Sequence, residues 1–212
     1  MKKIPSLFKR DYEGTRQVYD EVVPGSEWVI AGEGVATVKF DGTSCMVRDG
    51  KLYKRYDRKL KKGPYKRKKR DPAFQPELSD YKDAPDGWEA CEPEPNHHTG
   101  HWPGWVPVGD EPESKHHREA WGSHDRPYMP DGTYELVGPK IGGNPYNLTH
   151  HEFWVHGVSF QRVSEDTPPR TFEGLRKWFG ANIVEGIVWH HPDGRMVKIK
   201  RRDFGLPWPE GK

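Results

Sequence analysis

Apolar and polar residues alternate along residues 35–47, on both sides of Lys39, and the alternation breaks at Asp41-Gly42. A period of two is typical of β-strands with one buried face, and an Asp-Gly pair is typical of a tight turn. The pattern therefore predicts two strands that meet in a hairpin, with the Lys39 side chain beside the bend.

A second Asp-Gly pair, Asp49-Gly50, separates two more alternating runs. This combination is a strong signal for a hairpin. Further strands are expected at residues 131–138, 153–158, 183–189 and 196–200.

Helical spacing is visible in two places. Val18 and Val22 have it within residues 11–23, which end before a Pro-Gly pair, so a short helix is expected there. Thr171 is expected to cap a second helix, whose apolar face would include Leu175.

The composition favours a β-rich α+β domain with long loops. Only 33% of the 212 residues are hydrophobic, while the chain has 20 prolines, 23 glycines and nine tryptophans. A chain of this length is typical of one domain. We therefore expect a single minimal domain over residues 1–212, with a loop-rich insertion at residues 60–130 that is first basic and then acidic.

The two cysteines, Cys45 and Cys91, form neither a disulfide framework nor a metal-site pattern, which favours a reducing compartment. No apolar run reaches the ~18 residues of a membrane span. No apolar segment follows the Met-Lys-Lys start, as it would in a signal peptide. We expect a cytoplasmic, monomeric protein without a membrane partner.

Basic residues are concentrated in Lys51–Arg70, where 12 of 20 residues are Lys or Arg, although the formal net charge is only +2. Such a run is either a solvated surface or a binding site for phosphates. Because this run begins on the strand that follows the Lys39 region, we favour binding of a nucleic-acid backbone. The candidate contacts are Arg58, Lys59, Lys61 and Lys62.

His97, His98 and His101 lie in a segment rich in proline, glycine and tryptophan. Neither paired cysteines nor a helical His-x3-His frame accompanies them, as a structural zinc site would require. We interpret these histidines as surface residues.

The candidates for chemistry are one amine, two acids and two further lysines. Lys39 can act as a nucleophile if nearby positive charge favours loss of its proton. Glu135 is an acid within an apolar strand-like run, where an ionised carboxylate needs a partner. Glu185 begins another such run, and Lys198 and Lys200 share one face of the last strand. Each residue also has a plain alternative. Lys39 could be an ordinary turn lysine and Glu135 the acid of a buried salt bridge. Glu185 could be a turn acid, and Lys198 and Lys200 could form an exposed strand face.

The order of these residues resembles the motif set of the covalent nucleotidyltransferases, which include DNA ligases, RNA ligases and mRNA capping enzymes. The matching motifs are Lys39-x-Asp41-Gly42, Arg55, Glu135-Leu-Val-Gly138, residues 153–158, Glu185-Gly186-x-Val188 and Lys198-x-Lys200. The chain is most similar to the eukaryotic 5′-to-3′ RNA ligase 1 family, over residues 35–209 except for 110–130. The flanking likenesses are Asp57-Arg58-Lys59, Pro103–Val108, Gly142–Tyr146, Glu185–His190 and Gly205–Pro209.

The resemblance implies a nucleotidyltransferase (ATP-grasp-like adenylation) domain, with two antiparallel sheets flanked by helices. Lys39 would take AMP from ATP, Arg55 would bind phosphate, and Glu135 would bind the ribose hydroxyls. Mg²⁺ or Mn²⁺ would accompany ATP. The implied catalytic residues are Lys39, Lys198, Lys200 and Glu185. The implied nucleotide-binding residues are these four together with Asp41, Gly42, Arg55, Glu135 and His156. The implied metal ligands are Glu185 and Glu135.

Two positions depart from the family pattern. His156 stands where many relatives have an aromatic ring that stacks on the base, and an imidazole can also stack. Val38 stands where the family has Glu, so a side-chain contact to adenine is expected to be lost. ATP is therefore expected on the strength of the resemblance.

Only 12 residues follow Lys200, too few for the OB domain that follows the last motif in DNA ligases and capping enzymes. We therefore expect an RNA-repair ligase that joins 5′-phosphate and 3′-hydroxyl RNA ends through a lysyl-AMP intermediate. The basic residues named above would contact the RNA. The alternatives are a DNA ligase or a modifier of another acceptor that uses the same lysyl-nucleotide adduct, and a non-enzymatic RNA-binding module.

Overall fold

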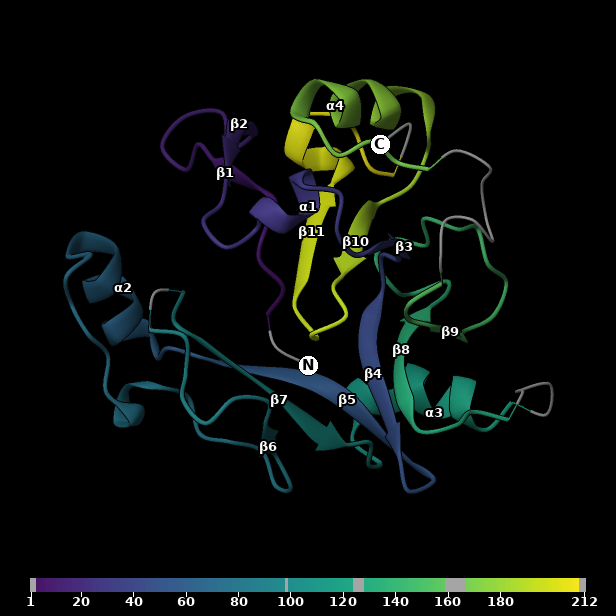
Figure 1. The fold of residues 1–212 in the computed structure, drawn as a ribbon. Coiled ribbons are helices and arrows are strands. Elements are labelled where there is room, and N and C mark those ends of the chain that lie inside the picture. The colour runs from purple at the N-terminus through teal and green to yellow at the C-terminus, as the bar shows by residue number, and fades with distance from the viewer. Residues whose placement is uncertain (1–2, 98, 124–127, 159–166, 210–212) are drawn as a thin grey trace. The chain divides into compact units, whose positions relative to one another are not determined.

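The computed structural model describes residues 3–97, 99–123, 128–158 and 167–209 (Figure 1). Antiparallel sheets and a few short helices make up its secondary structure, so the α+β class predicted from the sequence is confirmed. The chain divides into two compact units. The six-stranded unit comprises Met1–Lys3, Thr43–Ile141 and Leu148–Trp154, and the three-stranded unit comprises Ile4–Gly42, Gly142–Asn147 and Val155–Lys212.

The six-stranded unit is built on one sheet, with the strand order β6-β7-β5-β4-β8-β9. Asp49 and Gly50 join β4 to β5 and have φ values of 51° and 70°, as a two-residue hairpin turn requires. This hairpin prediction is confirmed. The strands are β4 (Thr43–Arg48), β5 (Lys51–Lys59), β6 (Glu89–Ala90), β7 (His101–Pro107), β8 (Gly132–Val137) and β9 (Glu152–Val155).

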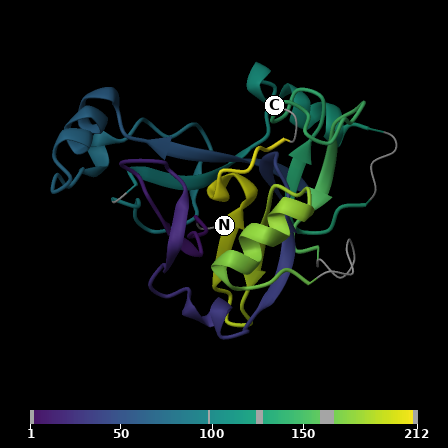
Figure 2. The ribbon, with the colours of Figure 1, turned by 90° about the horizontal axis from the view of Figure 1, so that it is seen from above.

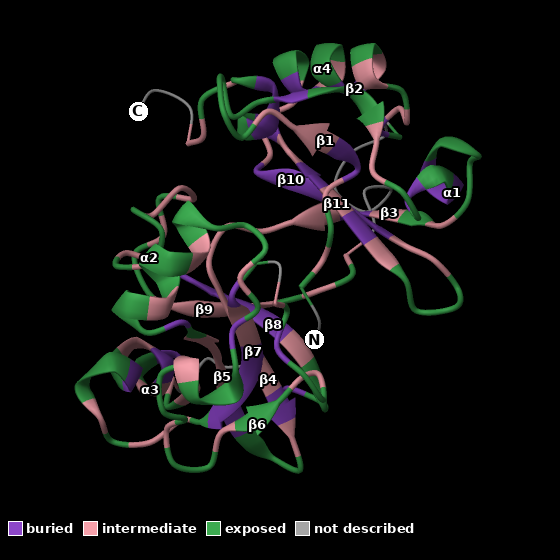
Figure 3. Ribbon diagram, turned by 90° about the vertical axis from the view of Figure 1, so that its left-hand side faces the viewer, coloured by how far each residue is buried: buried purple, intermediate pink, exposed green. Residues whose placement is uncertain are grey.

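The apolar face of this sheet packs against α3 (Lys115–Trp121). Cys45, Val47 and Leu136 are buried there beside Ala120 of the helix. The other helices of this unit are α2 (Lys62–Arg70) and the 3₁₀ turns η1 (Leu78–Asp80) and η2 (Pro112–Ser114). No residue of α2 is buried, as Figure 3 shows, so this basic helix is a surface element.

The three-stranded unit contains a sheet in the order β11-β10-β3, in which β10 is central. Gly186 of β10 lies opposite both Lys39 of β3 and Lys200 of β11. The strand predicted at residues 196–200 is confirmed residue by residue. The elements of this unit are β1 (Phe8–Arg10), β2 (Val18–Val22), α1 (Glu27–Ile30), β3 (Val35–Lys39), α4 (Phe172–Ala181), β10 (Gly186–His190), β11 (Met196–Lys200) and η4 (Arg201–Phe204).

Helix α4 covers the apolar face of this smaller sheet (Figure 2). Leu175 of the helix is buried in one cluster with Ile187 of β10 and Ile199 of β11. Oγ1 of Thr171 accepts a hydrogen bond from the backbone N of Gly174 at 3.3 Å, which confirms the predicted cap. Within the described residues, none of the helices combines the length and the apolar character needed to cross a lipid bilayer.

The hairpin predicted around Asp41-Gly42 is wrong. β3 pairs with β10, whereas β4 pairs with β5 and β8, so the two strands belong to different sheets. Alternation identified both strands, but it carries no information about which strands pair. Asp41-Gly42 instead connects the three-stranded unit to the six-stranded unit along the chain.

The helix predicted within residues 11–23 is also wrong. Val22 belongs to β2 and lies opposite Phe8 of β1. The Asp11 carboxylate accepts hydrogen bonds from the backbone N of Gly14 and of Thr15, both at 2.8 Å, which forms a turn where the helix was expected. Valines four residues apart fit one face of a strand as well as one face of a helix, and β-branched residues favour the strand.

Candidate active site

Lys39 and Lys200 meet at the carboxylate of Glu185. Nζ of Lys39 lies 2.6 Å from Oε2 of Glu185, and Nζ of Lys200 lies 2.5 Å from Oε1. The Glu185 side chain is fully buried, while the side chains of Lys39 and Lys200 are 21% and 25% exposed. The structure therefore brings three of the predicted catalytic residues together, with both cations accessible from solvent.

The residue after Glu185 is glycine for a steric reason. A Cβ on Gly186 would lie 2.5 Å from the carbonyl O of Ile199 and 3.2 Å from Cα of Lys200. Only a residue without a side chain lets β10 approach β11 this closely at the position where Gly186 is paired with Lys39 and Lys200.

Lys198 shares a face of β11 with Lys200, because residues two apart in a strand point the same way. It lies opposite Val188 of β10, which in turn lies opposite Thr37 of β3. Thr37 is two residues before Lys39, so Lys39, Lys198 and Lys200 all project from the face that is not covered by α4.

Val38 points to the other face of β3. Its side chain packs against the apolar cluster that includes Ile187, whereas Lys39 points away from that cluster. The position before Lys39 is therefore a core position in this fold, and its apolar side chain contributes to the packing of the sheet.

His156 lies in the turn after β9, because β9 ends at Val155. The sequence had placed it inside a strand over residues 153–158, so that boundary is wrong. Burial is the main cause that lowers the pKa of His190, and the charge of His156 lowers it further. Nε2 of His190 lies 2.9 Å from Oγ1 of Thr37. Neither Thr37 nor His190 was assigned a role from the sequence, although His190 is the last residue of the flanking likeness Glu185–His190.

Asp41 is held by two aromatic residues from distant parts of the sequence. Its backbone N–H donates to the hydroxyl of Tyr146 at 2.7 Å, and Nε1 of Trp208 donates to its Oδ2 at 2.8 Å. The ring centroids of Tyr146 and Trp208 are 6.1 Å apart. The segments Gly142–Tyr146 and Gly205–Pro209, which the sequence showed only as flanking likenesses, thus fix the residue two positions after Lys39.

Arg55 and Glu135 belong to the six-stranded unit and project from one face of its sheet. Ser44 of β4 pairs with Glu135 of β8, while its neighbour Cys45 pairs with Lys54, the residue before Arg55. Because side chains alternate, Arg55, Ser44 and Glu135 lie on the face opposite to the buried Cys45. Glu135 is 7% exposed, and the predicted strand around it is confirmed.

The guanidinium of Arg55 is oriented by two neighbours. Nε donates to Oδ1 of Asp57 at 2.7 Å, and the guanidinium carbon lies 5.6 Å from the centroid of the Trp105 ring. His101, and after it Arg55, hold the pKa of Asp57 far below its usual range. Arg55 also lines a pocket of about 770 Å³ within this unit.

The four basic residues predicted to contact nucleic acid fall into two groups. Arg58 is half-buried: its guanidinium carbon lies 5.0 Å from the ring centroids of both Trp88 and Trp102, and its Nε donates to the carbonyl O of Lys82 at 2.8 Å. Arg58 therefore has a structural role in this unit. The exposed members are Lys59, Lys61 and Lys62.

The two predicted metal ligands lie in different units, Glu185 in the three-stranded unit and Glu135 in the six-stranded unit. Both are buried carboxylates, the kind of donor that Mg²⁺ and Mn²⁺ prefer.

Among the histidines interpreted as surface residues, His97 is half-buried, His98 lies outside the described residues, and Nδ1 of His101 lies 3.6 Å from Oδ2 of Asp57.

Comparisons with known proteins agree with the family resemblance of the sequence. The family model described as RNA ligase 1 matches residues 125–212, a range that contains Glu135, His156, Glu185, Lys198 and Lys200. RNA ligase 1 of Danio rerio is 30% identical over an alignment length of 268, and the alignment covers 98% of this chain and 82% of the relative. RNA ligase 1 of Pongo abelii is 32% identical over 225 residues, with 82% of this chain and 68% of the relative covered. This chain belongs to the RNA ligase 1 family.

Proposed function

We propose that this chain is an ATP-dependent RNA ligase that joins 5′-phosphate and 3′-hydroxyl RNA ends through a lysyl-AMP intermediate on Lys39. The observation that carries the proposal is the buried Glu185 carboxylate, which lies within 2.6 Å of the Lys39 amine and 2.5 Å of the Lys200 amine. Membership of the RNA ligase 1 family supports the choice of RNA.

The proposed fold is that of a nucleotidyltransferase domain of the adenylation type. Support comes from the motif residues, which lie at equivalent positions of neighbouring strands. Lys39 ends β3, Glu185 directly precedes β10, and Lys200 ends β11, so all three lie at the same end of the three-stranded sheet. The single-domain extent of this fold stays a prediction from the sequence.

In the first step, Nζ of Lys39 attacks the α-phosphorus of ATP. A nitrogen–phosphorus bond forms, the bond to the bridging oxygen breaks, and pyrophosphate leaves. The amine must give up a proton, and the Glu185 oxygen at 2.6 Å is a suitable acceptor. Lys198 and Lys200 share the Lys39 face of the sheet, where their charges would stabilise the negative charge on the transferring phosphate.

The other two steps use the same adduct. The 5′-phosphate of an RNA end attacks the phosphorus of lysyl-AMP, which forms an RNA-adenylate and restores the Lys39 amine. A 3′-hydroxyl of a second RNA end then attacks the 5′-phosphate, which forms the phosphodiester and releases AMP. Each step exchanges one bond at phosphorus, so positioning and charge stabilisation are the main tasks of the protein.

Further residues are proposed to hold the nucleotide. Arg55 would bind a phosphate with its oriented guanidinium, and Glu135 would accept hydrogen bonds from the ribose hydroxyls. His156 would stack on the base. Asp41 and Gly42 would set the backbone beside Lys39. Mg²⁺ or Mn²⁺ would neutralise the ATP phosphates when bound, and Glu185 and Glu135 are each proposed as a carboxylate ligand for such an ion.

The exposed lysines Lys59, Lys61 and Lys62 are proposed to contact the phosphates of the RNA. The last of these opens α2, a helix without a buried residue, so its lysines and arginines are available to a backbone. Arg58 is proposed to hold this surface in place through Trp88 and Trp102.

The first experiment is incubation of the purified chain with Mg²⁺ and ATP labelled at the α-phosphate. We expect one covalent label per chain, which is lost in Lys39→Ala and kept in Lys9→Ala. Lys9 is the control because it pairs with Glu21 within the two-stranded sheet of β1 and β2. A Lys39→Ala protein that still acquires the label would refute the assignment.

The second experiment supplies the labelled protein with 5′-phosphate RNA, DNA or hybrid ends. We expect sealing of RNA ends that carry a 3′-hydroxyl, with release of AMP. A stable adduct without sealing of any RNA end would overturn the ligase and indicate another acceptor, and sealing of DNA alone would indicate a DNA ligase.

A further inference from the structure

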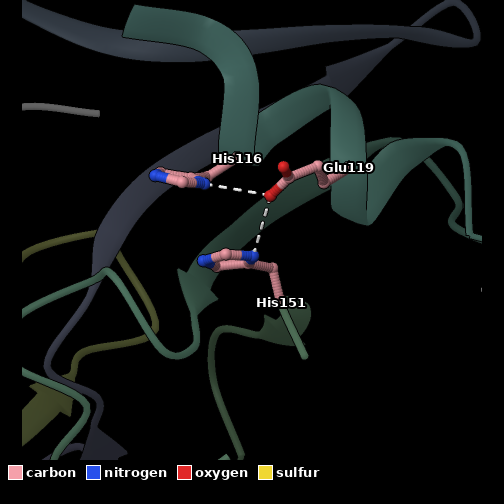
Figure 4. Close-up of side chains that lie close together, drawn as sticks. All are labelled: His116, Glu119 and His151. Atoms are coloured by element: carbon pink, nitrogen blue, oxygen red, sulfur yellow. Dashed lines mark hydrogen bonds and ion pairs between the residues drawn. The ribbon is translucent and has the colours of Figure 1, made fainter. Parts of the chain in front are cut away.

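Two histidines and a glutamate of the six-stranded unit converge on one point (Figure 4). One ligand atom from each of His116, Glu119 and His151 lies within 4.8 Å of the other two. Nδ1 of His116 lies 3.0 Å from Oε2 of Glu119, and Nδ1 of His151 lies 3.2 Å from the same oxygen. None of these residues belongs to the motif set described above.

The fold holds the three side chains in this arrangement. His116 and Glu119 are three residues apart on α3, so they lie on the same face of the helix. His151 comes from the segment before β9, and its imidazole stacks on that of His116 with centroids 4.4 Å apart and planes 25° apart. Figure 4 shows both Nδ1 atoms directed at the Glu119 carboxylate.

Gly138 makes room for His151. It has a φ of +148°, and a Cβ at this position would lie 2.5 Å from Cδ2 and 2.8 Å from Cα of His151. The chain after β8 can therefore approach the histidine only because residue 138 is glycine. As a result, the side chain of His151 is only 10% exposed, and its place in the cluster is fixed by packing.

We propose that His116, Glu119 and His151 form a binding site for a divalent transition metal of the zinc type. Two imidazoles and one carboxylate are a typical donor set for such ions, and they leave one coordination position open for water. Mg²⁺ is a poor match, because it prefers oxygen ligands.

The spacing of the donors fits this ion. Two ligands at about 2.0–2.1 Å from a tetrahedral metal are roughly 3.3 Å apart. The separations of 3.0 and 3.2 Å between Oε2 of Glu119 and the two Nδ1 atoms are close to that value. A metal bound by all three donors would join α3 to the segment before β9.

The test uses the full chain without a polyhistidine tag, freed of metal with a chelator and titrated with Co²⁺, whose visible absorption reports coordination. We expect one equivalent to bind and to be displaced by Zn²⁺ but not by excess Mg²⁺. The affinity should fall by at least about tenfold in His116→Ala and His151→Ala, since even changes outside the ligand set cause such losses. His150→Ala is the matched control, because His150 is adjacent, 69% exposed and paired with Glu152.

The thermal midpoint of the metal-free proteins shows whether a variant has kept its fold. If His151→Ala does not fold, Glu119→Gln serves in its place, since it keeps the shape of the side chain and removes the negative charge. Absence of a Co²⁺ spectrum in the wild-type chain overturns the proposal. An affinity in His116→Ala or Glu119→Gln that equals that of the wild type overturns it as well, because the three side chains would then be joined only by hydrogen bonds.

Discussion

Nζ of Lys39 lies 2.6 Å from a carboxylate oxygen of Glu185, although 146 positions separate the two residues in the sequence. The contact exists because Gly186, the residue after Glu185, is paired directly with Lys39 across β3 and β10. On the other side of Gly186 stands Lys200, so one strand position determines the placement of all three functional groups.

Glu185→Gln is expected to slow formation of lysyl-AMP by at least about 10²-fold, because the amide can neither accept the proton of the Lys39 amine nor balance two ammonium groups. The free energy of unfolding should fall by about 3 kcal/mol, the cost of breaking a buried ion pair from one side. Rates of label incorporation and denaturant unfolding check the two effects. Glu33→Gln, at an exposed acid of the same unit, is the control, and a Glu185→Gln protein labelled as fast as wild type would contradict the role of Glu185.

Gly186→Ala is expected to destabilise the three-stranded unit by about 1–3 kcal/mol, because its Cβ would overlap the backbone of β11. β10 and β11 must separate where Gly186 is paired with Lys200, so lysyl-AMP formation should be lost as well. Gly180→Ala is the matched substitution: Gly180 lies in α4 with open space around it, and alanine there should stabilise the protein by about 0.5–1 kcal/mol. Equal thermal midpoints for the two variants would contradict the close approach of β10 and β11.

Trp208→Phe removes the indole N–H that donates to Asp41 at 2.8 Å. A hydrogen bond to a charged group is worth about 1.5–3 kcal/mol, so label incorporation should slow by roughly tenfold or more if the bond positions Asp41 for the reaction. Trp154→Phe removes a comparable bond, from its indole N–H to Glu152 at 3.0 Å, and should leave the rate of labelling unchanged. If both variants slow labelling equally, Trp208 has no special role beside Asp41.

Lys62→Ala is expected to weaken RNA binding without affecting formation of lysyl-AMP. Each lost phosphate contact should reduce the slope of log K against log salt concentration by about 0.7 for a single strand. Binding of 5′-phosphate RNA, measured between low and high salt, gives this slope. Lys115→Ala, at a lysine of α3 that is 66% exposed, should keep the wild-type slope, and an unchanged slope in Lys62→Ala would remove α2 from the RNA contact surface.

Local patterns located several elements correctly. The Met196–Lys200 strand, the Asp49-Gly50 turn and the Thr171 cap each depend on neighbours within a few residues, and all three are confirmed. The errors occurred where a local pattern was compatible with two structures. Val18 and Val22 fit a helix or a strand, and the pairing of β2 with β1 decided between them.

The candidate site shows the same division. Lys39, Glu185, Lys198 and Lys200 could be selected from the sequence, because each motif is a short run whose order along the chain is informative. Tyr146, Trp208, Thr37 and His190 could not be assigned a role, since their partners lie far away in sequence. The cluster of His116, Glu119 and His151 was missed for the same reason: its third member, His151, lies 32 residues after Glu119 in the sequence.

By itself the sequence determined the fold class, the family resemblance and the residue types available for chemistry, because composition, alternation and motif order are properties of the linear chain. Only the tertiary structure decided that β3 pairs with β10, that Glu185 lies between two lysines, and that Asp41 is held by Tyr146 and Trp208. Strand pairing and side-chain contacts are chosen by packing among all segments at once, and no local pattern encodes that choice.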